Sequence, residues 1–190
     1  MSALIKSAED PLVQGTPQVM WLTGLSGAGK TTLARQLVEM LRTEGRQVVH
    51  VDGDSVRAML GDDLGHSPSD RLENAYRISK LCQFLQQQGT MVVCSTMSLY
   101  PEIWEWNRKN LSPYTMVYVK VGVDELRKRD QKGLYSGVEE GRCSNVVGID
   151  LPFNEPRQAC LTLRNENIEE QKINLMRLYE FVRRDDYETR

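Results

Sequence analysis

The stretch "GLSGAGKTT" at residues 24–32 constrains this chain most, because it combines glycines, a lysine and threonines at fixed spacing. It fits the pattern G-x-x-x-x-G-K-[ST], which runs from Gly24 through Gly29 to Lys30 and Thr31. Glycines let the backbone bend where a Cβ atom would obstruct it, so the N–H groups of such a loop can point at phosphate oxygens. The pattern predicts a P-loop in which Lys30 reaches the β- and γ-phosphates and the Thr31 hydroxyl ligates Mg²⁺.

The sequence on either side of this stretch has the order that a P-loop requires. Residues 19–23 form a short apolar run that is typical of a buried strand. From Lys30 onward, apolar residues at helical spacing form one face, and Gly45 ends the helix. That face consists of Leu33, Leu37, Val38 and Leu41. Strand, glycine loop and helix together predict binding of ATP and Mg²⁺, and the candidate nucleotide-binding residues here are Gly24, Ser26, Gly27, Ala28, Gly29, Lys30, Thr31 and Thr32.

Two acids follow the second predicted strand, in "VDGDSVR" at residues 51–57. Asp52 and Asp54 are expected at the carboxyl end of that strand, where open α/β sheets bind their ligands. In a phosphoryl-transfer site one carboxylate holds Mg²⁺ or its water, and another can accept the proton of the attacking hydroxyl. The candidate catalytic residues are therefore Asp54, Lys30 and Asp52, with Thr31 and Asp52 as the candidate metal ligands.

The rest of the chain predicts a mainly parallel sheet covered by helices on both faces, which is an α/β fold. Strands are expected at 19–23, 48–51, 90–94 and 116–121, with helices at 71–88 and 166–184. The expected apolar stripes are Leu72, Ala75, Ile78, Leu81, Cys82 and Leu85 in the first of these helices, and Ile168, Leu175, Leu178, Tyr179 and Val182 in the second. Residues 131–157 are rich in glycine and proline, and a loop of that length is usually a functional lid or disordered.

Composition narrows the function classes. A length of 190 residues suits one domain, and a net charge of −2 gives no general attraction to nucleic acid or to an anionic membrane. No apolar run approaches the roughly 18 residues of a membrane span, and residues 1–17 are expected to be a loose lead-in without a signal peptide. The four cysteines, two of them expected in the core, show no metal spacing, which favours reduced thiols in a cytoplasmic protein.

Four motifs occur in one order: "GLSGAGKTT", "VDGDSVRAMLGDDLGHSPSDRLENAYRI", "RDQKGLY" and "VVGID". Together they resemble the adenylylsulfate (APS) kinase family over roughly residues 18–160. The resemblance implies a P-loop nucleotide kinase fold with a five-stranded sheet in one domain at 18–190, and a mobile lid at roughly 123–157. It also implies transfer of the ATP γ-phosphoryl group to the ribose 3′-hydroxyl of a nucleotide that carries an activated anion, and often a homodimer.

The resemblance assigns roles residue by residue. Asp54 would be the base or orienting group for the 3′-hydroxyl, with Lys30 and Thr31 serving the ATP phosphates and Mg²⁺. Arg57, Arg71 and Asn74 match positions that bind the acceptor, and guanidinium groups suit such anions because they bind their oxygens bidentately. Ser98 would line the acceptor pocket, while Arg129 and Lys132 would belong to the lid, whose closure excludes water.

The sequence departs from the family at the acceptor positions. APS kinases typically hold the acceptor adenine between two phenylalanines, in "LGFS" and "GFTGID", whereas this chain has His66 in "LGHS" and Val146 in "NVVGID". An imidazole offers less stacking area, and valine has no π face. Pro101 and Trp104 also stand where the family usually has arginines. Because the nucleotide-side motifs are intact, these changes favour an acceptor other than APS.

The motifs and the changes at the acceptor positions leave three functions open. The first resembles the branch of the family that phosphorylates cytidine diphosphoramidate for phosphoramidate-modified capsular polysaccharide, with Glu102 or Asn107 as a partner for the N–H groups of the acceptor. The second is a divergent APS kinase of sulfate assimilation, in which Tyr100 or Trp104 replaces the missing aromatic rings. The third is a nucleotide-binding regulator without catalysis, which predicts a damaged P-loop or a missing Asp54, and both are intact.

Overall fold

The computed structural model describes residues 18–60, 63–65 and 67–188. In this part of the chain five parallel strands form one sheet in the order β2-β3-β1-β4-β5. They are β1 (Val19–Thr23), β2 (Val48–Asp52), β3 (Met91–Ser95), β4 (Tyr114–Lys120) and β5 (Leu161–Arg164). The predicted α/β fold with a five-stranded parallel sheet is confirmed. The predicted lead-in at residues 1–17 lies outside the described residues.

β1 lies at the centre of the sheet, and all of its residues are buried because β3 and β4 pair with it on either side. The register aligns the ends of neighbouring strands, with Leu22 opposite Ser95 and Ser95 opposite Asp52. Since the strands are parallel, the loops that follow β1, β2 and β3 all leave the sheet at the same edge. This edge carries the P-loop stretch, the two acids and the Ser98 loop.

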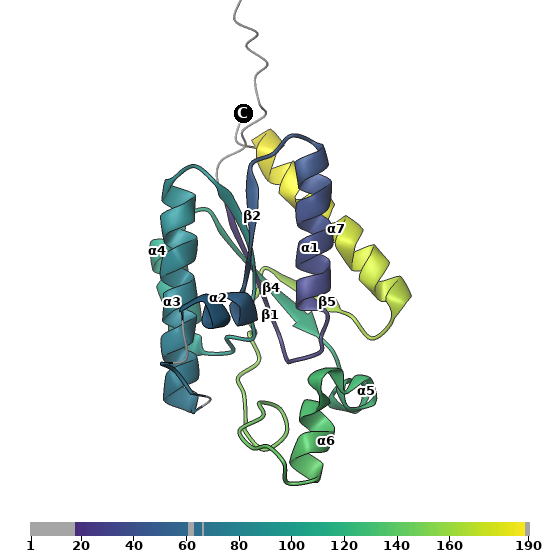
Figure 1. The fold of residues 1–190 in the computed structure, drawn as a ribbon. Helices are drawn as coiled ribbons and strands as arrows, with labels where there is room; N and C mark the ends of the chain where they lie inside the picture. The colour runs from purple at the N-terminus through teal and green to yellow at the C-terminus, as the bar shows by residue number, and fades with distance from the viewer. Residues whose placement is uncertain (1–17, 61–62, 66, 189–190) are drawn as a thin grey trace, which may run out of the picture.

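Helices cover both faces of the sheet, as the sequence predicts (Figure 1). α1 (Lys30–Thr43) and α7 (Ile168–Glu188) lie on one face, and α3 (Pro68–Gln87) and α4 (Pro101–Asn110) on the other. The predicted apolar face of α1 is fully buried. α3 begins with a capping box, in which Ser67 and Asp70 satisfy each other's backbone N–H groups, and it ends just before Gly89.

One residue of the predicted stripe on α7 is placed differently. Leu178 and Val182 are buried, but Ile168 is 60% exposed. Ile168 is the first residue of the helix, so it lies at the end of the predicted stripe rather than within it. The predicted spacing holds for the buried positions Leu178 and Val182, but not for this terminal one.

Four shorter helices surround the carboxyl edge of the sheet: α2 (Gly53–Leu60), α5 (Val123–Arg129), the 3₁₀ helix η1 (Gln131–Gly133) and α6 (Leu134–Glu139). α5 and α6 lie together beyond the strand ends in the lower part of Figure 1. The stretch 131–157 is therefore partly helical, although its short, glycine-bounded helices leave no periodic apolar signal. The mobility of the 123–157 segment, called the lid segment below, stays a prediction.

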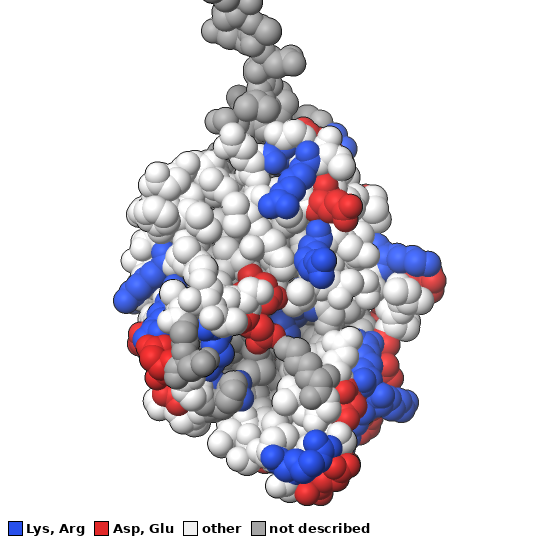
Figure 2. Space-filling model, in the orientation of Figure 1, with Lys and Arg blue, Asp and Glu red and all other residues white. Residues whose placement is uncertain are grey.

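The cysteines follow the sequence-based expectation: Cys82 and Cys94 are buried, Cys143 is half-buried and Cys160 is exposed, and all four are free thiols. Within the described residues, no helix has both the length and the apolar composition needed to cross a membrane. On the face shown in Figure 2, basic and acidic side chains are interspersed over the surface.

Candidate active site

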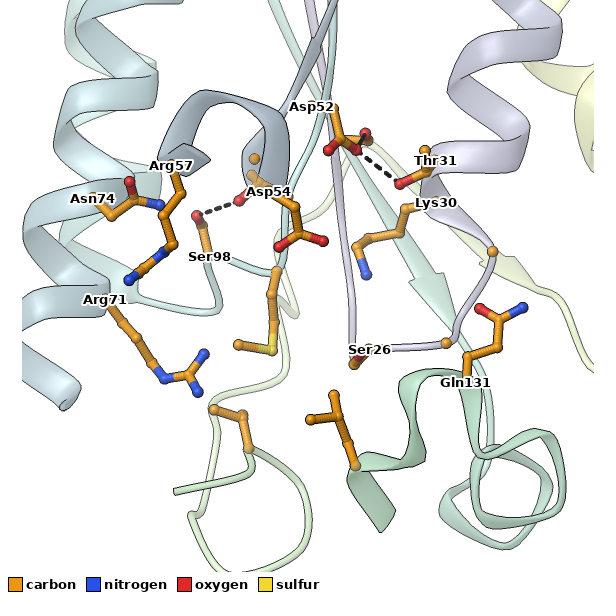
Figure 3. Close-up of a pocket in the computed structure, with 18 of the residues that line it drawn as sticks. Ser26, Lys30, Thr31, Asp52, Asp54, Arg57, Arg71, Asn74, Ser98 and Gln131 are labelled. Carbon is orange, nitrogen blue, oxygen red and sulfur yellow. Dashed lines mark hydrogen bonds between the residues drawn. The ribbon is translucent and has the colours of Figure 1, made fainter. Parts of the chain in front are cut away.

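A cavity of about 320 Å³ opens at the carboxyl edge of the sheet. Figure 3 shows it between the P-loop and α1 on one side and α2 and α3 on the other. It is lined by Ser26, Gly27, Gly29, Lys30, Thr31, Thr32, Asp52, Gly53, Asp54, Arg57, Arg71, Asn74, Ser95, Thr96, Met97, Ser98, Tyr100, Gln131, Leu134, Val146 and Val147. Most of the site residues predicted from the sequence are therefore brought together around one cavity.

At two positions of the P-loop, the backbone conformation and the close approach of neighbouring atoms require glycine. Gly24 has a φ of 149°, and a Cβ atom there would lie 2.3 Å from the carbonyl oxygen of Val119. Gly29 has a φ of 91°, and a Cβ atom there would lie 2.5 Å from Nδ2 of Asn165. The loop thus passes directly over the ends of β4 and β5 before α1 begins at Lys30. The first N–H groups of a helix have no partner within the helix, which makes this end of α1 suited to phosphate.

The side chain of Lys30 folds back against the loop that precedes it. Its side chain is mostly buried, and its Nζ donates a hydrogen bond to the carbonyl oxygen of Leu25 at 2.7 Å. In Figure 3 the ammonium group points into the cavity from the α1 side. A cation held here faces any anion that the loop N–H groups bind, as the predicted role in phosphate binding requires.

Asp52 is the centre of a hydrogen-bond network. Its Oδ2 accepts from Thr31 Oγ1 at 2.9 Å and from Ser95 Oγ at 3.0 Å. Its Oδ1 accepts from the backbone N–H of Ser55 at 3.1 Å and from Ser55 Oγ at 3.2 Å. Burial opposes ionisation of this carboxyl group, but the hydrogen bonds from Ser55, Thr31 and Ser95 outweigh it and lower the pKa of Asp52. Asp52 is therefore held as a carboxylate.

The network also includes His50, which lies on the edge strand β2. Nε2 of His50 lies 2.9 Å from Oγ of Ser95, which itself donates to Asp52. Burial lowers the pKa of His50, so the neutral ring is favoured. Ser55 and Ser95 are not among the site residues predicted from the sequence. Their positions could have indicated the contacts with Asp52, since Ser55 follows Asp52 by three residues and Ser95 ends the strand next to β2.

The donor set at this end of the cavity fits Mg²⁺. A threonine hydroxyl and a carboxylate are the oxygen ligands that this ion prefers, and it usually takes only one or two protein carboxylates together with phosphates and waters. Among the described residues, no cluster of three or more His, Cys, Asp or Glu side chains could form an all-protein metal cage. Thr31 and Asp52 are adjacent as predicted, and their role as metal ligands is a proposal.

Asp54 faces the cavity from the start of α2. It is the second residue of that helix, and in Figure 3 its carboxylate points into the space between Lys30 and Arg57. This places an acid between the lysine that follows the P-loop and the arginine of α2 (Figure 3). The position is compatible with the predicted base.

Basic side chains gather on the half of the cavity opposite the P-loop. Arg57 donates to the carbonyl oxygen of Gly65 at 2.6 Å, and Arg71 donates to that of Asn145 at 3.0 Å. Burial and the neighbouring Arg57 lower the pKa of Arg71, but an arginine guanidinium stays charged near neutral pH. Asn74 is buried beside them on α3. All three residues line the cavity, and their predicted role in binding the acceptor stays a prediction.

Val146 lines the cavity and is 6% exposed. Its loop is fixed by Asp150, whose carboxylate accepts from the backbone N–H groups of Asn145 at 2.7 Å and Val146 at 2.5 Å. Met97, Leu134 and Val147 add further aliphatic surface to the cavity. Among the described lining residues, Tyr100 has the one aromatic ring. His66, the other predicted contact of the acceptor base, lies outside the described residues.

Ser98, on the loop after β3, lies at the cavity as predicted. The expected contacts of Trp104, Asn107 and Glu102 with the acceptor are not supported. Ser98 lines the cavity, and its Oγ lies 2.9 Å from Thr96 Oγ1. Trp104 is buried in the core, and its indole donates to the carbonyl oxygen of Ser98 at 3.0 Å, so it does not line the cavity as a stacking surface. Asn107 is buried and donates to the Tyr114 hydroxyl at 3.4 Å, and neither it nor the exposed Glu102 lines the cavity. Pro101 begins α4, which turns these side chains away.

The sequence also predicts nucleotide contacts from two residues of the lid segment, Arg129 and Lys132. Arg129 donates to the carbonyl oxygens of Gly27 at 3.3 Å and Asn165 at 2.8 Å, rather than lining the cavity itself. The side chain of Lys132 lies outside the described residues. The predicted direct contacts of both residues with the nucleotides stay predictions.

A parallel sheet in this strand order, with a glycine loop before α1 and two acids after β2, defines a P-loop kinase. The profile that describes adenylylsulphate kinase matches residues 16–164. The chain belongs to the adenylylsulphate kinase family, as its motifs predict.

Individual relatives agree with this assignment. The cytidine diphosphoramidate kinase of Campylobacter jejuni is 37% identical over 166 residues, which cover 86% of this chain and 96% of that enzyme. The adenylyl-sulfate kinase of Bacillus velezensis is 38% identical over 167 residues, which cover 87% and 84% of the two chains. The structure of the Mycobacterium tuberculosis APS kinase in complex with AMPPNP and APS matches with a TM-score of 0.77 and 30% identity, covering 86% of this chain and 99% of that one. The identities of 37% and 38% to enzymes named for different acceptors therefore do not distinguish between the two acceptors.

Proposed function

We propose that this chain transfers the γ-phosphoryl group of ATP to the ribose 3′-hydroxyl of a nucleotide, and that this nucleotide is cytidine diphosphoramidate. The observation that carries the choice of acceptor is the aliphatic side chain of Val146 in the cavity lining. A lining residue without a π face suits a small pyrimidine better than an adenine that needs stacking on both sides. The Campylobacter jejuni relative, named for this acceptor, supports the same reading.

The proposed roles divide the cavity into two halves. The P-loop N–H groups and Lys30 bind the phosphates of ATP, while Thr31 and Asp52 hold Mg²⁺, which neutralises charge on the phosphate oxygens. Asp54, between the two halves, accepts the proton of the 3′-hydroxyl as that oxygen attacks. Arg57 and Arg71 bind the anionic diphosphoramidate portion of the acceptor. Because phosphoryl transfer needs mainly positioning and electrostatic stabilisation, these side chains suffice for the chemistry.

Adenylylsulfate is the second candidate acceptor. Tyr100 favours it, because this ring lines the cavity near Arg71 and offers one stacking surface for a purine. The Bacillus velezensis and Mycobacterium tuberculosis enzymes support it by similarity. The role of a regulator without catalysis has no such support, since Lys30, Asp52 and Asp54 all line the cavity.

The test is ADP release, coupled to a spectroscopic readout, with each of the two acceptors and with neither. The proposal predicts a higher kcat/KM with cytidine diphosphoramidate than with adenylylsulfate. A higher kcat/KM with adenylylsulfate would reject the cytidine acceptor and leave the kinase assignment standing. Equal ADP release with and without acceptor would reject 3′-phosphoryl transfer altogether.

A further inference from the structure

The carbonyl groups of the P-loop accept hydrogen bonds from side chains that are distant in the sequence. The carbonyl oxygen of Ser26 accepts from the Tyr135 hydroxyl at 3.0 Å. The next carbonyl, that of Gly27, accepts from Arg129 at 3.3 Å, and that of Ala28 accepts from Asn165 Nδ2 at 2.8 Å. Three consecutive carbonyl groups are thus held by three donors from outside the loop.

This arrangement has a direct physical consequence for phosphate binding. A peptide unit is planar, so a carbonyl group that is fixed on one side of the loop directs the N–H group of the next residue to the other side. The N–H groups that follow the three carbonyls belong to Gly27, Ala28 and Gly29. That of Ala28 donates to the carbonyl oxygen of Leu25 at 3.3 Å, whereas Gly27 and Gly29 line the cavity. Donors on the outside of the loop therefore keep N–H groups oriented toward the place where phosphate oxygens bind.

Two of these donors, Tyr135 and Asn165, are buried and hydrogen-bonded to other parts of the fold. Tyr135 is 2% exposed, and its own backbone N–H donates to Asp130 at 2.8 Å. Asn165 is 2% exposed, its backbone N–H donates to the carbonyl oxygen of Lys120 at 3.0 Å, and Asn174 of α7 lies against its side chain at 3.4 Å. Such buried polar groups are costly unless they are paired, so each position is well determined.

Two of the three donors also join the lid segment to the P-loop. Tyr135 and Arg129 both belong to the lid segment, and Arg129 additionally donates to the carbonyl oxygen of Asn165 at 2.8 Å. Asn165 itself follows β5 at the edge of the sheet. The P-loop is therefore fixed between the lid segment and the end of the sheet.

We propose that Tyr135, Arg129 and Asn165 are positioning residues, which orient the P-loop for ATP by holding its carbonyl groups outward. The inference rests on the proposed use of ATP and is independent of the acceptor. Losing one neutral hydrogen bond weakens an interaction by roughly two- to ten-fold, so removing a single donor reduces nucleotide affinity without abolishing folding.

The experiment compares Tyr135→Phe with the unaltered protein by calorimetric titration with AMPPNP and Mg²⁺, without acceptor. Tyr135→Phe removes one hydroxyl group and leaves the buried ring in place. The expected result is a dissociation constant for AMPPNP that is roughly two- to ten-fold higher, with an unchanged number of binding sites. Steady-state assays should show a higher KM for ATP with kcat changed less than KM.

The matched control is Tyr114→Phe, which removes a buried hydroxyl group at the far end of β4 and should leave the dissociation constant unchanged. Asn165→Ala provides a second donor deletion, which should weaken AMPPNP binding in the same direction. Unchanged AMPPNP binding in both Tyr135→Phe and Asn165→Ala would overturn the inference. Failure of the unaltered protein to bind AMPPNP would overturn the proposed use of ATP, and the inference with it.

Discussion

The hydroxyl group of Thr31 donates a hydrogen bond to Oδ2 of Asp52 at 2.9 Å, which joins the first turn of α1 to the end of β2. The two residues come from a helix and a strand, and they meet because β1, which leads into α1, and β2 end at the same edge of the parallel sheet. Their oxygens form one corner of the cavity, next to the P-loop. This corner is where the account places Mg²⁺, since both oxygen types are suited to that ion.

Replacing Thr31 by alanine removes one oxygen ligand and one donor to Asp52. We expect the Mg²⁺ concentration needed for half-maximal binding of ATP to rise by about tenfold, a magnitude in the range seen when groups around a metal site are removed. Calorimetric titrations of ATP at several Mg²⁺ concentrations measure this shift. Thr43→Ala is the control, because it removes an exposed hydroxyl at the other end of α1. An identical Mg²⁺ dependence for Thr31→Ala would contradict the proposed ligand.

Asp54→Asn tests the proposed base. The amide keeps the shape of the side chain but cannot accept a proton, so kcat should fall by about 10²- to 10⁴-fold, while the dissociation constant for ATP changes little. Stopped-flow or steady-state ADP release gives kcat, and calorimetry gives ATP affinity. Glu169→Gln, an exposed change on α7, controls for the loss of one negative charge. Undiminished turnover in Asp54→Asn would remove Asp54 from the mechanism.

Much of this fold could be predicted because local patterns were strong. The P-loop, the apolar face of α1 and four buried strands leave clear sequence signals, and the structure has all of them. β5 was not located, because it has only four residues and two of them, Thr162 and Arg164, are exposed at the edge of the sheet. α4 was missed because its buried residues, Ile103, Trp104 and Asn107, are spread among charged ones.

The residues that line the cavity were easier to predict from the sequence than the residues that hold the P-loop in place. Lys30, Thr31 and Asp54 belong to short motifs, in which residue type and spacing encode the role. Tyr135 and Asn165 contact backbone carbonyl groups more than a hundred positions away along the chain, so no local pattern reports them. The misplacement of Asn107 has a similar cause, because the phase of α4 relative to the cavity depends on packing against α3 and the sheet.

Val146→Phe tests the basis of acceptor choice. A phenyl ring at this position restores a stacking surface, which is worth about 0.5–1.5 kcal/mol for an aromatic pair. We therefore expect the ratio of kcat/KM for adenylylsulfate to that for cytidine diphosphoramidate to rise by roughly two- to ten-fold. Val146→Leu is the matched control, because it adds volume without a π face. An equal change of the ratio in both variants would show that size rather than stacking sets the preference.

Glu155 anchors the far end of the lid segment to β4. The Lys120 ammonium group, 2.8 Å away, and the Tyr118 hydroxyl lower the pKa of Glu155 below its ordinary value of 4.5, against the opposing effect of burial. Since the folded state binds this proton more weakly, the stabilisation is present above pH 4.5 and is lost as pH falls through the folded-state pKa. The two side chains are 43% and 45% exposed, so we expect an effect below about 1 kcal/mol.

Urea unfolding of Glu155→Gln at several pH values measures this contribution. The variant should be less stable than the unaltered protein near neutral pH, and the difference should shrink as the pH falls, because a protonated glutamate resembles glutamine. Glu180→Gln on α7 serves as a control for removal of a carboxylate elsewhere. A stability difference that persists undiminished into acid would show that the pair with Lys120 is not its source.

The most direct test of the central claim is the position of the transferred phosphoryl group. Cytidine diphosphoramidate is incubated with ATP, Mg²⁺ and the protein, and the products are examined by two-dimensional ¹H–³¹P correlation NMR. The expected product is a new phosphate monoester whose phosphorus correlates with the ribose H3′ proton. A product phosphorylated at any other position, or ADP and inorganic phosphate as the only new phosphorus species, would contradict the proposed 3′-phosphoryl transfer.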